Sequence, residues 1–128
     1  MTRALADTSL FIARESGRRL ADVHLPDELA ISVITLGELR AGVLAAADIS
    51  SRDRRLATLA EALTFDAVPI DQPVAETWAR LRLLLRDAGR RMPVNDSWIA
   101  ATAMTLGVPV VTQDDDYVEV VGLLVIRV

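Results

Sequence analysis

Apolar residues along the chain form short runs that alternate with longer stretches of helical spacing. The clearest run, 108–112, is apolar and β-branched, which is typical of a buried strand. Similar short runs lie near both ends of the chain and between the helical stretches. The predicted strands are 5–6, 29–32, 67–70, 108–112 and 123–128.

In the helical stretches, apolar residues recur every three or four positions, as on one face of a helix. Leu56, Leu59 and Leu63 follow this spacing. Asp71 followed by Pro73 is the N-cap and early-proline pattern that begins helices, and glycines are placed to end them. The predicted helices are 9–16, 34–46, 54–63, 71–87 and 93–106.

Strands that alternate with helices predict an α/β sandwich with a mainly parallel sheet. The 128 residues contain no linker, repeat or low-complexity segment, so we expect a single domain, 1–128. A chain of this length buries about two-thirds of its unfolded surface without a disulfide or a metal. In such sheets ligands bind beyond the carboxyl ends of the strands, and functional residues are expected there.

Composition narrows the chemistry. Hydrophobic residues make up 52% of the chain but aromatic residues only 4%, so the core is expected to be aliphatic. Cysteine is absent, which excludes disulfides, thiolate zinc sites and cysteine nucleophiles. No apolar run approaches the roughly 18 residues of a membrane span, and the N-terminus lacks a signal-peptide pattern. The sequence therefore predicts a soluble cytoplasmic protein with no membrane partner.

The charged residues exclude further enzyme classes. All fourteen basic residues are arginine, the only histidine is His24, and the net charge is −4. A P-loop requires a lysine, and a multi-histidine metal site requires more than the single imidazole of this chain. If the protein is an enzyme, its eighteen carboxylates must carry the chemistry.

Four of these acids are expected at one edge of the sheet. Asp7 follows the first predicted strand and Asp114 follows the clearest one. Asp96 begins the helix before that strand, and Glu38 lies in the first turns of another helix. Carboxylates that converge repel each other, and no lysine is present to neutralise them. A hard divalent cation such as Mg²⁺ or Mn²⁺ would suit a site with only oxygen ligands.

Each acid also has a purely structural interpretation. Asp7 and Asp96 fit helix N-caps. Glu38 could be a solvated helical residue, and 114–116 could be a polar turn. These interpretations remain open from spacing alone.

Four segments of the chain resemble the motifs of VapC-type PIN domains, in the order in which that family has them. They read DTS at 7–9, ITLGELRAG at 34–42, PVNDSWIAATA at 93–103 and VVTQDDDY at 110–117. Each motif is weak alone, but together they span nearly the whole chain. The resemblance implies the PIN-domain fold, a three-layer α/β/α sandwich.

The resemblance also implies the roles of individual residues. Asp7, Glu38, Asp96 and Asp114 would be the catalytic residues and would bind Mg²⁺ or Mn²⁺, with Asp116 as a further ligand. Around them, small hydroxyl side chains would cap the first helix or hold the aspartates in place. Gln113 departs from the family, which often has a basic residue there. The supporting hydroxyl residues are Thr8, Ser9 and Thr112.

The activity implied is metal-dependent hydrolysis of RNA phosphodiester bonds, leaving a 5′-phosphate and a 3′-hydroxyl. Proteins similar to this one act as toxins that inhibit translation and growth. A small VapB-type antitoxin holds them in a hetero-oligomer, and many form homodimers. Two alternatives stay open: a PIN-fold interaction module with weak catalysis, and a structure-specific DNA nuclease.

Several other side chains have two interpretations. Three arginine clusters either contact RNA phosphates or form ordinary solvated surface, and the sequence does not choose among them. The apolar residues of the first helices could line an antitoxin groove, although a core role is favoured. Trp78 and Trp98 are interpreted as packing residues, and His24 as a surface or packing residue. The arginine clusters are 14/18/19, 52/54/55 and 86/90/91, and the apolar residues are Leu10, Phe11, Leu36 and Leu39.

Overall fold

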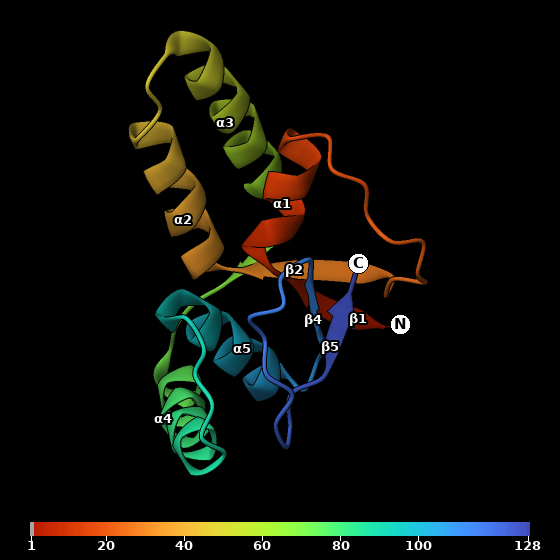
Figure 1. Cartoon of the computed structure of the whole chain (residues 1–128), viewed down its shortest axis with the longest axis vertical. Helices are drawn as coiled ribbons and strands as arrows, with labels where there is room; N and C mark the ends of the chain where they lie inside the picture. The colour runs from red at the N-terminus through yellow and green to blue at the C-terminus, as the bar shows by residue number, and fades with distance from the viewer. Residues whose placement is uncertain (1) are drawn as a thin grey trace.

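The computed structural model describes residues 2–128. Its centre is a five-stranded sheet in which every neighbouring pair of strands is parallel, with the order β3-β2-β1-β4-β5 (Figure 1). The mainly parallel sheet predicted from the sequence is therefore confirmed. The strands are β1 (Arg3–Ala6), β2 (Glu28–Ser32), β3 (Asp66–Val68), β4 (Val110–Thr112) and β5 (Val125–Arg127).

Five helices cover the two faces of the sheet. In Figure 1, α1, α2 and α3 lie on one side of the sheet, and α4 and α5 lie on the other. This is the predicted three-layer α/β/α sandwich. The helices are α1 (Thr8–Glu15), α2 (Val33–Leu44), α3 (Ile49–Ala62), α4 (Gln72–Asp87) and α5 (Val94–Leu106).

The boundary that the sequence predicted least well is the start of α3. The helix begins at Ile49, five residues before the predicted position, because the Asp48 carboxylate caps it through the Ser51 amide at 2.7 Å. Apart from Ile49, the first turn is polar, and most of it is exposed, so it carries no apolar periodicity. By contrast, Asp71 caps α4 as predicted, accepting from the Val74 amide at 3.1 Å.

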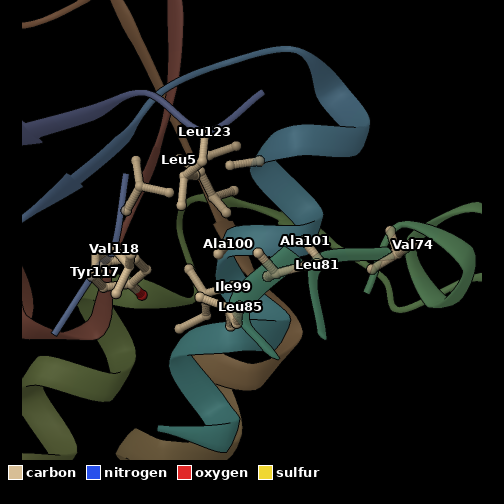
Figure 2. Close-up of a cluster of buried hydrophobic side chains, with 13 residues drawn as sticks. Leu5, Val74, Leu81, Leu85, Ile99, Ala100, Ala101, Tyr117, Val118 and Leu123 are labelled. Carbon is tan, nitrogen blue, oxygen red and sulfur yellow. The ribbon is translucent and has the colours of Figure 1, made fainter. Parts of the chain in front are cut away.

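Successive strand residues point to opposite faces of the sheet and pack into two separate hydrophobic cores. Leu5 and Val110 face α4 and α5, in the cluster drawn in Figure 2. Ala4, Ala6 and Val111 face α1, α2 and α3 on the other side. Both faces of the central strands are therefore covered by helices, which fits the nearly continuous apolar runs seen in the sequence.

The register brings the ends of two strands together. Leu5 pairs with Val110 and Ala6 with Val111, and the Asp7 amide donates to the Val111 carbonyl at 2.8 Å. The order of the strands reverses direction between β1 and β4, and this is where parallel sheets open a crevice at their carboxyl ends. Residues that follow β1 and β4 therefore meet at one place. Among residues 2–128, no helix is both long enough and apolar enough to span a lipid bilayer.

Candidate active site

Asp7 lies at the junction of β1 and α1 and is almost fully buried, with 1% of its surface exposed. One carboxylate oxygen, Oδ2, accepts hydrogen bonds from the Ser9 amide at 3.3 Å and the Thr112 hydroxyl at 2.9 Å. The other, Oδ1, accepts from the Tyr117 hydroxyl at 2.7 Å. Asp7 is the N-cap of α1, so its structural interpretation is correct, and its place at the sheet edge is as predicted.

A hollow of about 200 Å³ opens beside Asp7. All four predicted acids, Asp7, Glu38, Asp96 and Asp114, line it. They come from four parts of the chain that meet only in the folded protein. Thr8, Ser9, Ile12 and Arg18 complete the lining.

Asp96 is the third residue of α5 and only 9% exposed. The N-cap interpretation of this residue is wrong, because Pro93 occupies the cap position and no side chain caps the helix. Burial raises the pKa of Asp96 to about 7, with contributions from the carboxylates of Asp7, Asp114, Glu38 and Asp116. A helix N-terminus normally favours a negative charge, so desolvation and like charges outweigh that effect here.

Asp114 and Asp116 lie in the loop after β4. One carboxylate oxygen from each lies within 4.8 Å of the others and of an Asp96 oxygen, close enough for the three to share an ion. Burial, followed by the charges of Asp7 and Asp116, raises the pKa of Asp114, and Arg18 opposes the rise. Asp115 points away, exposed, with Arg127 at 3.7 Å.

Glu38 is positioned by threonines rather than by an opposite charge. The Thr8 hydroxyl donates to Glu38 Oε1 at 2.8 Å and lies 2.9 Å from the Thr35 hydroxyl. Glu38 is therefore not a freely solvated helical residue. Neither it nor Asp7 belongs to the group of close oxygens formed by Asp96, Asp114 and Asp116, although both line the hollow together with Asp96 and Asp114.

The predicted supporting hydroxyls act differently from one another. Neither Thr8 nor Ser9 caps α1 through its side chain, because Asp7 holds that position. The Ser9 hydroxyl instead accepts from the Gln113 amide at 2.9 Å and lies 3.2 Å from the Thr112 hydroxyl. Thr112 accepts from the Asp114 amide at 2.9 Å while donating to Asp7, so one hydroxyl links two of the acids.

The sequence analysis did not place Tyr117 or Arg18 at the acidic site. Tyr117 is 1% exposed, and burial together with the Asp7 carboxylate raises the pKa of its phenol far above the ordinary value. The hydroxyl therefore stays protonated and can donate to Asp7. The signal in the sequence is that this is the only tyrosine of the chain, just after the acidic run. Arg18 belongs to the first of the three arginine clusters noted in the sequence, but it lies in the irregular segment after α1, so the sequence did not place it beside the acids.

The remaining side chains singled out in the sequence have structural roles. Trp78 and Trp98 stack with ring centroids 4.2 Å apart, which confirms packing. Gln113 donates through its side chain to the carbonyls of Arg19 and Val128, so its amide ties two loops together. His24 is exposed. Leu10, Phe11 and Leu39 are buried in the core, with Leu36 packed against them.

The hollow suits a divalent cation. Its acidic donors are all carboxylate oxygens, which are the ligands that Mg²⁺ and Mn²⁺ prefer. Four carboxylates and one arginine line the hollow. Burial first, and then the neighbouring carboxylates, raise the pKa of Asp96 and of Asp114. A cation would relieve the repulsion between the carboxylates and favour their charged form.

Comparison with known proteins settles the family. The sequence profile of the PIN domain matches residues 4–123. The chain belongs to the PIN-domain family. The resemblance to VapC-type members is also confirmed, since two such relatives from Mycobacterium tuberculosis are close to half identical. Ribonuclease VapC5 is 51% identical over 91% of this chain and 86% of its own length, and Ribonuclease VapC4 is 48% identical over 98% and 97%.

The fold agrees with this assignment. The crystal structure of VapBC-5 from Mycobacterium tuberculosis, described as a member of the VapBC family of toxin–antitoxin systems, contains a chain that matches with a TM-score of 0.92. The two chains are 44% identical and cover each other completely. The PIN-domain sandwich is therefore the fold of this protein along its whole length.

Proposed function

We propose that this PIN-domain protein is a Mg²⁺- or Mn²⁺-dependent endoribonuclease and the toxin of a VapBC-type pair. The observation that carries the proposal is the hollow lined by Asp7, Glu38, Asp96 and Asp114 in a chain about half identical to two ribonucleases. An interaction module would have no need to keep four carboxylates together against their repulsion.

In this proposal Asp7, Asp96 and Asp114 hold the metal, with Glu38 bound directly or through water. Asp116 joins them in this proposal, because one of its carboxylate oxygens lies within 4.8 Å of an oxygen of Asp96 and of Asp114. A divalent cation supplies a Lewis acid for the phosphoryl oxygens and makes water a better nucleophile at neutral pH. The products expected are a 5′-phosphate and a 3′-hydroxyl.

The chain's own residues keep the acids in place. Tyr117 and Thr112 fix the Asp7 carboxylate from two sides, and Thr8 fixes Glu38. Arg18, in the same lining, offers a guanidinium to the phosphate of a bound strand, a group that it can contact through two N–H donors. Such positioning before the substrate arrives is a large part of catalysis in a polar site.

The partner expected is a VapB-type antitoxin, since the VapBC-5 structure is described as a toxin–antitoxin system. Inhibition of translation follows if the cleaved RNA belongs to the translation machinery. Co-purification from the native operon, with and without the neighbouring small gene, tests the partnership. Size-exclusion chromatography with light scattering tests the homodimer and the hetero-oligomer.

The test of activity is cleavage of total RNA by the purified chain in Mg²⁺, with EDTA as the metal-free control. Asp96→Asn and Asp7→Asn should abolish cleavage while the proteins still fold. Asp53→Asn, which removes an exposed carboxylate on α3, serves as the matched control and should cleave as the wild type does. Mapping the new RNA ends would then identify the target.

Two outcomes would favour the alternatives. RNA binding without metal-dependent cleavage would support an interaction module. Metal-dependent cleavage of branched or flapped DNA, with RNA left intact, would support a structure-specific DNA nuclease. An Asp7→Asn protein that cleaves RNA at the wild-type rate would remove Asp7 from the catalytic set.

A further inference from the structure

A second hollow, of about 420 Å³, lies between α4 and the start of α5. Four arginines line it, from α4 and from the loop that follows. We call it the arginine cleft. Its lining residues are Arg82, Leu85, Arg86, Arg90, Arg91, Met92 and Ser97.

The local fold brings the four arginines together. Arg82 and Arg86 are four positions apart and so lie on one face of α4. The helix ends at Asp87, and Gly89 follows with a φ of +65°, a conformation that costs glycine little. The Arg90 amide then donates to the Leu85 carbonyl at 2.9 Å, turning the chain back. Arg90 and the next residue, Arg91, therefore lie beside the same helix face.

The charges in this cleft are poorly neutralised within the protein. Arg86 has a 3.4 Å contact with its neighbour Asp87, a highly exposed pair that contributes little. Arg82 stacks over the Trp78 ring at 5.1 Å. Among residues 2–128, no carboxylate comes within ion-pair distance of Arg82, Arg90 or Arg91. In a protein of net charge −4, this concentration of positive charge favours an anionic ligand.

The other two predicted clusters are more committed to contacts within the protein. Arg14 pairs with Glu61, and Arg55 donates to the Gly42 carbonyl. Arg54 bonds the hydroxyls of Ser50 and Ser51 at the start of α3. The structure thus distinguishes among arginine clusters that the sequence left equivalent.

The first turn of α5 separates the arginine cleft from the acidic hollow. Ser97 lines the arginine cleft and Asp96 lines the acidic hollow. Asn95 lines a third hollow, which it shares with Glu38. Three successive residues of one helical turn therefore face three neighbouring depressions, and a chain that crosses this turn passes from positive charge to the cluster of acids.

We propose that the arginine cleft binds backbone phosphates of the RNA strand next to the cleaved bond. This inference rests on the proposed ribonuclease function. Arginine binds phosphate through paired N–H donors and through charge, without reading the base. A polynucleotide that is cleaved at the acidic hollow needs the phosphates next to the reacting one held in place, and an acidic peptide has no such requirement.

The test measures RNA binding in an Asp7→Asn background, so that the strand stays intact. The probe is a fluorescent single-stranded RNA of mixed sequence, titrated by anisotropy at several salt concentrations in Mg²⁺. Arg90→Gln/Arg91→Gln should weaken binding roughly tenfold and lower the slope of log affinity against log salt by about 1.4, the value for two lost phosphate contacts on a single strand. The matched control is Arg52→Gln/Arg54→Gln on α3, with the same loss of charge and wild-type binding expected.

The outcomes separate this inference from the proposed function. If the wild type cleaves RNA but the two double variants bind it equally, the arginine cleft is not the phosphate subsite and the ribonuclease function stands. If Arg90→Gln/Arg91→Gln loses affinity for a co-expressed antitoxin while RNA binding is unchanged, the cleft is a protein-binding surface and the inference is overturned. A wild type that neither binds nor cleaves RNA overturns both proposals. Circular dichroism and thermal melting confirm that each variant is folded.

Discussion

Asp7 and Asp96 line the same hollow and are both buried, but their carboxylates differ in the hydrogen bonds that they accept. Asp7 accepts three hydrogen bonds, from Ser9, Thr112 and Tyr117. Asp96 accepts none from residues 2–128, and its pKa is raised to about 7. In the satisfied half of the hollow, the protein supplies hydrogen-bond donors to the Asp7 carboxylate. In the other half, the Asp96 carboxylate is left for a cation to bind.

This difference shows how an acidic site can be rigid and still bind metal. Three hydrogen bonds hold Asp7 in position before any ligand binds. The Thr8 hydroxyl of α1 does the same for Glu38, and the Thr35 hydroxyl of α2 lies next to that of Thr8. Asp96, Asp114 and Asp116 each supply a carboxylate oxygen, and the three oxygens lie within 4.8 Å of one another. Repulsion between these carboxylates lowers the free energy of unfolding of the metal-free protein.

The largest effect expected is that of Asp96→Asn. Cleavage should fall by a factor on the order of a hundred or more, because a metal ligand and its charge are lost. The metal-free variant should nevertheless melt a few degrees above the wild type, since about 1 kcal/mol of relieved repulsion raises the Tm of a domain of this size by roughly 3–5 °C. Differential scanning fluorimetry in EDTA checks the second part.

A metal-free Asp96→Asn protein that melts below the wild type would contradict the comparison, because Asp96 would then be held by the protein as Asp7 is. Asp53→Asn in the same assay controls for the general effect of removing one negative charge.

Tyr117→Phe tests the satisfied half. It removes only the hydroxyl that donates to Asp7, leaving a buried carboxylate oxygen short of a donor. We expect a loss of about 1–3 kcal/mol in the free energy of unfolding, the usual cost of leaving a buried polar group without its hydrogen-bond partner. Cleavage should fall less than in Asp96→Asn, because the carboxylate remains. Urea unfolding monitored by tryptophan fluorescence measures the first effect, and unchanged stability would show that Asp7 does not depend on Tyr117.

The pH dependence of stability distinguishes Asp96 from the hydrogen-bonded Asp7 without any substitution in the wild-type protein. The folded-state pKa of Asp96 lies near 7 and its unfolded value near 3.8, so the unfolded chain releases this proton at lower pH. Its contribution to stability is therefore present at pH below about 4 and is lost as the pH rises to about 7. In EDTA the Tm of the wild type should decline over pH 5–7 relative to that of Asp96→Asn.

Excess Mg²⁺ should reverse that trend, because metal binding requires the deprotonated carboxylate and strengthens as the pH rises. A Mg²⁺-induced rise in Tm that is equally large at pH 5 and at pH 8 would argue that Asp96 is not a ligand.

The smallest effect expected is that of Thr8→Val, which removes the hydroxyl that bonds Glu38. Stability should fall by about 1 kcal/mol, the typical net value of one hydrogen bond, and cleavage by a few-fold as Glu38 gains freedom. Thr35→Val is the matched control, because it removes the hydroxyl that lies next to that of Thr8 and leaves the bond from Thr8 to Glu38 intact. Equal cleavage by the two variants would show that the contact of Thr8 with Glu38 does not matter for activity.

Much of the fold could be predicted because its signals are local. The apolar run at 108–112 and the capping pattern at Asp71 are enough to indicate β4 and α4, since strand and helix periodicities and caps depend on neighbours in the sequence. The start of α3 could not be found in this way, because a polar, exposed first turn has no periodic signal.

In the candidate site, too, local signals could be predicted from the sequence and contacts between distant residues could not. The order of strands and helices placed Asp7 and Asp114 at one edge of the sheet, and the four motifs indicated which acids belong together. The sequence could not show that Tyr117 donates to Asp7 across 110 positions, that Asp96 is left without a donor, or which arginines form a cleft beside the acids. Motifs and periodicity report on near neighbours, whereas hydrogen bonds, desolvation and charge clusters depend on distances in space that only the packed layers set.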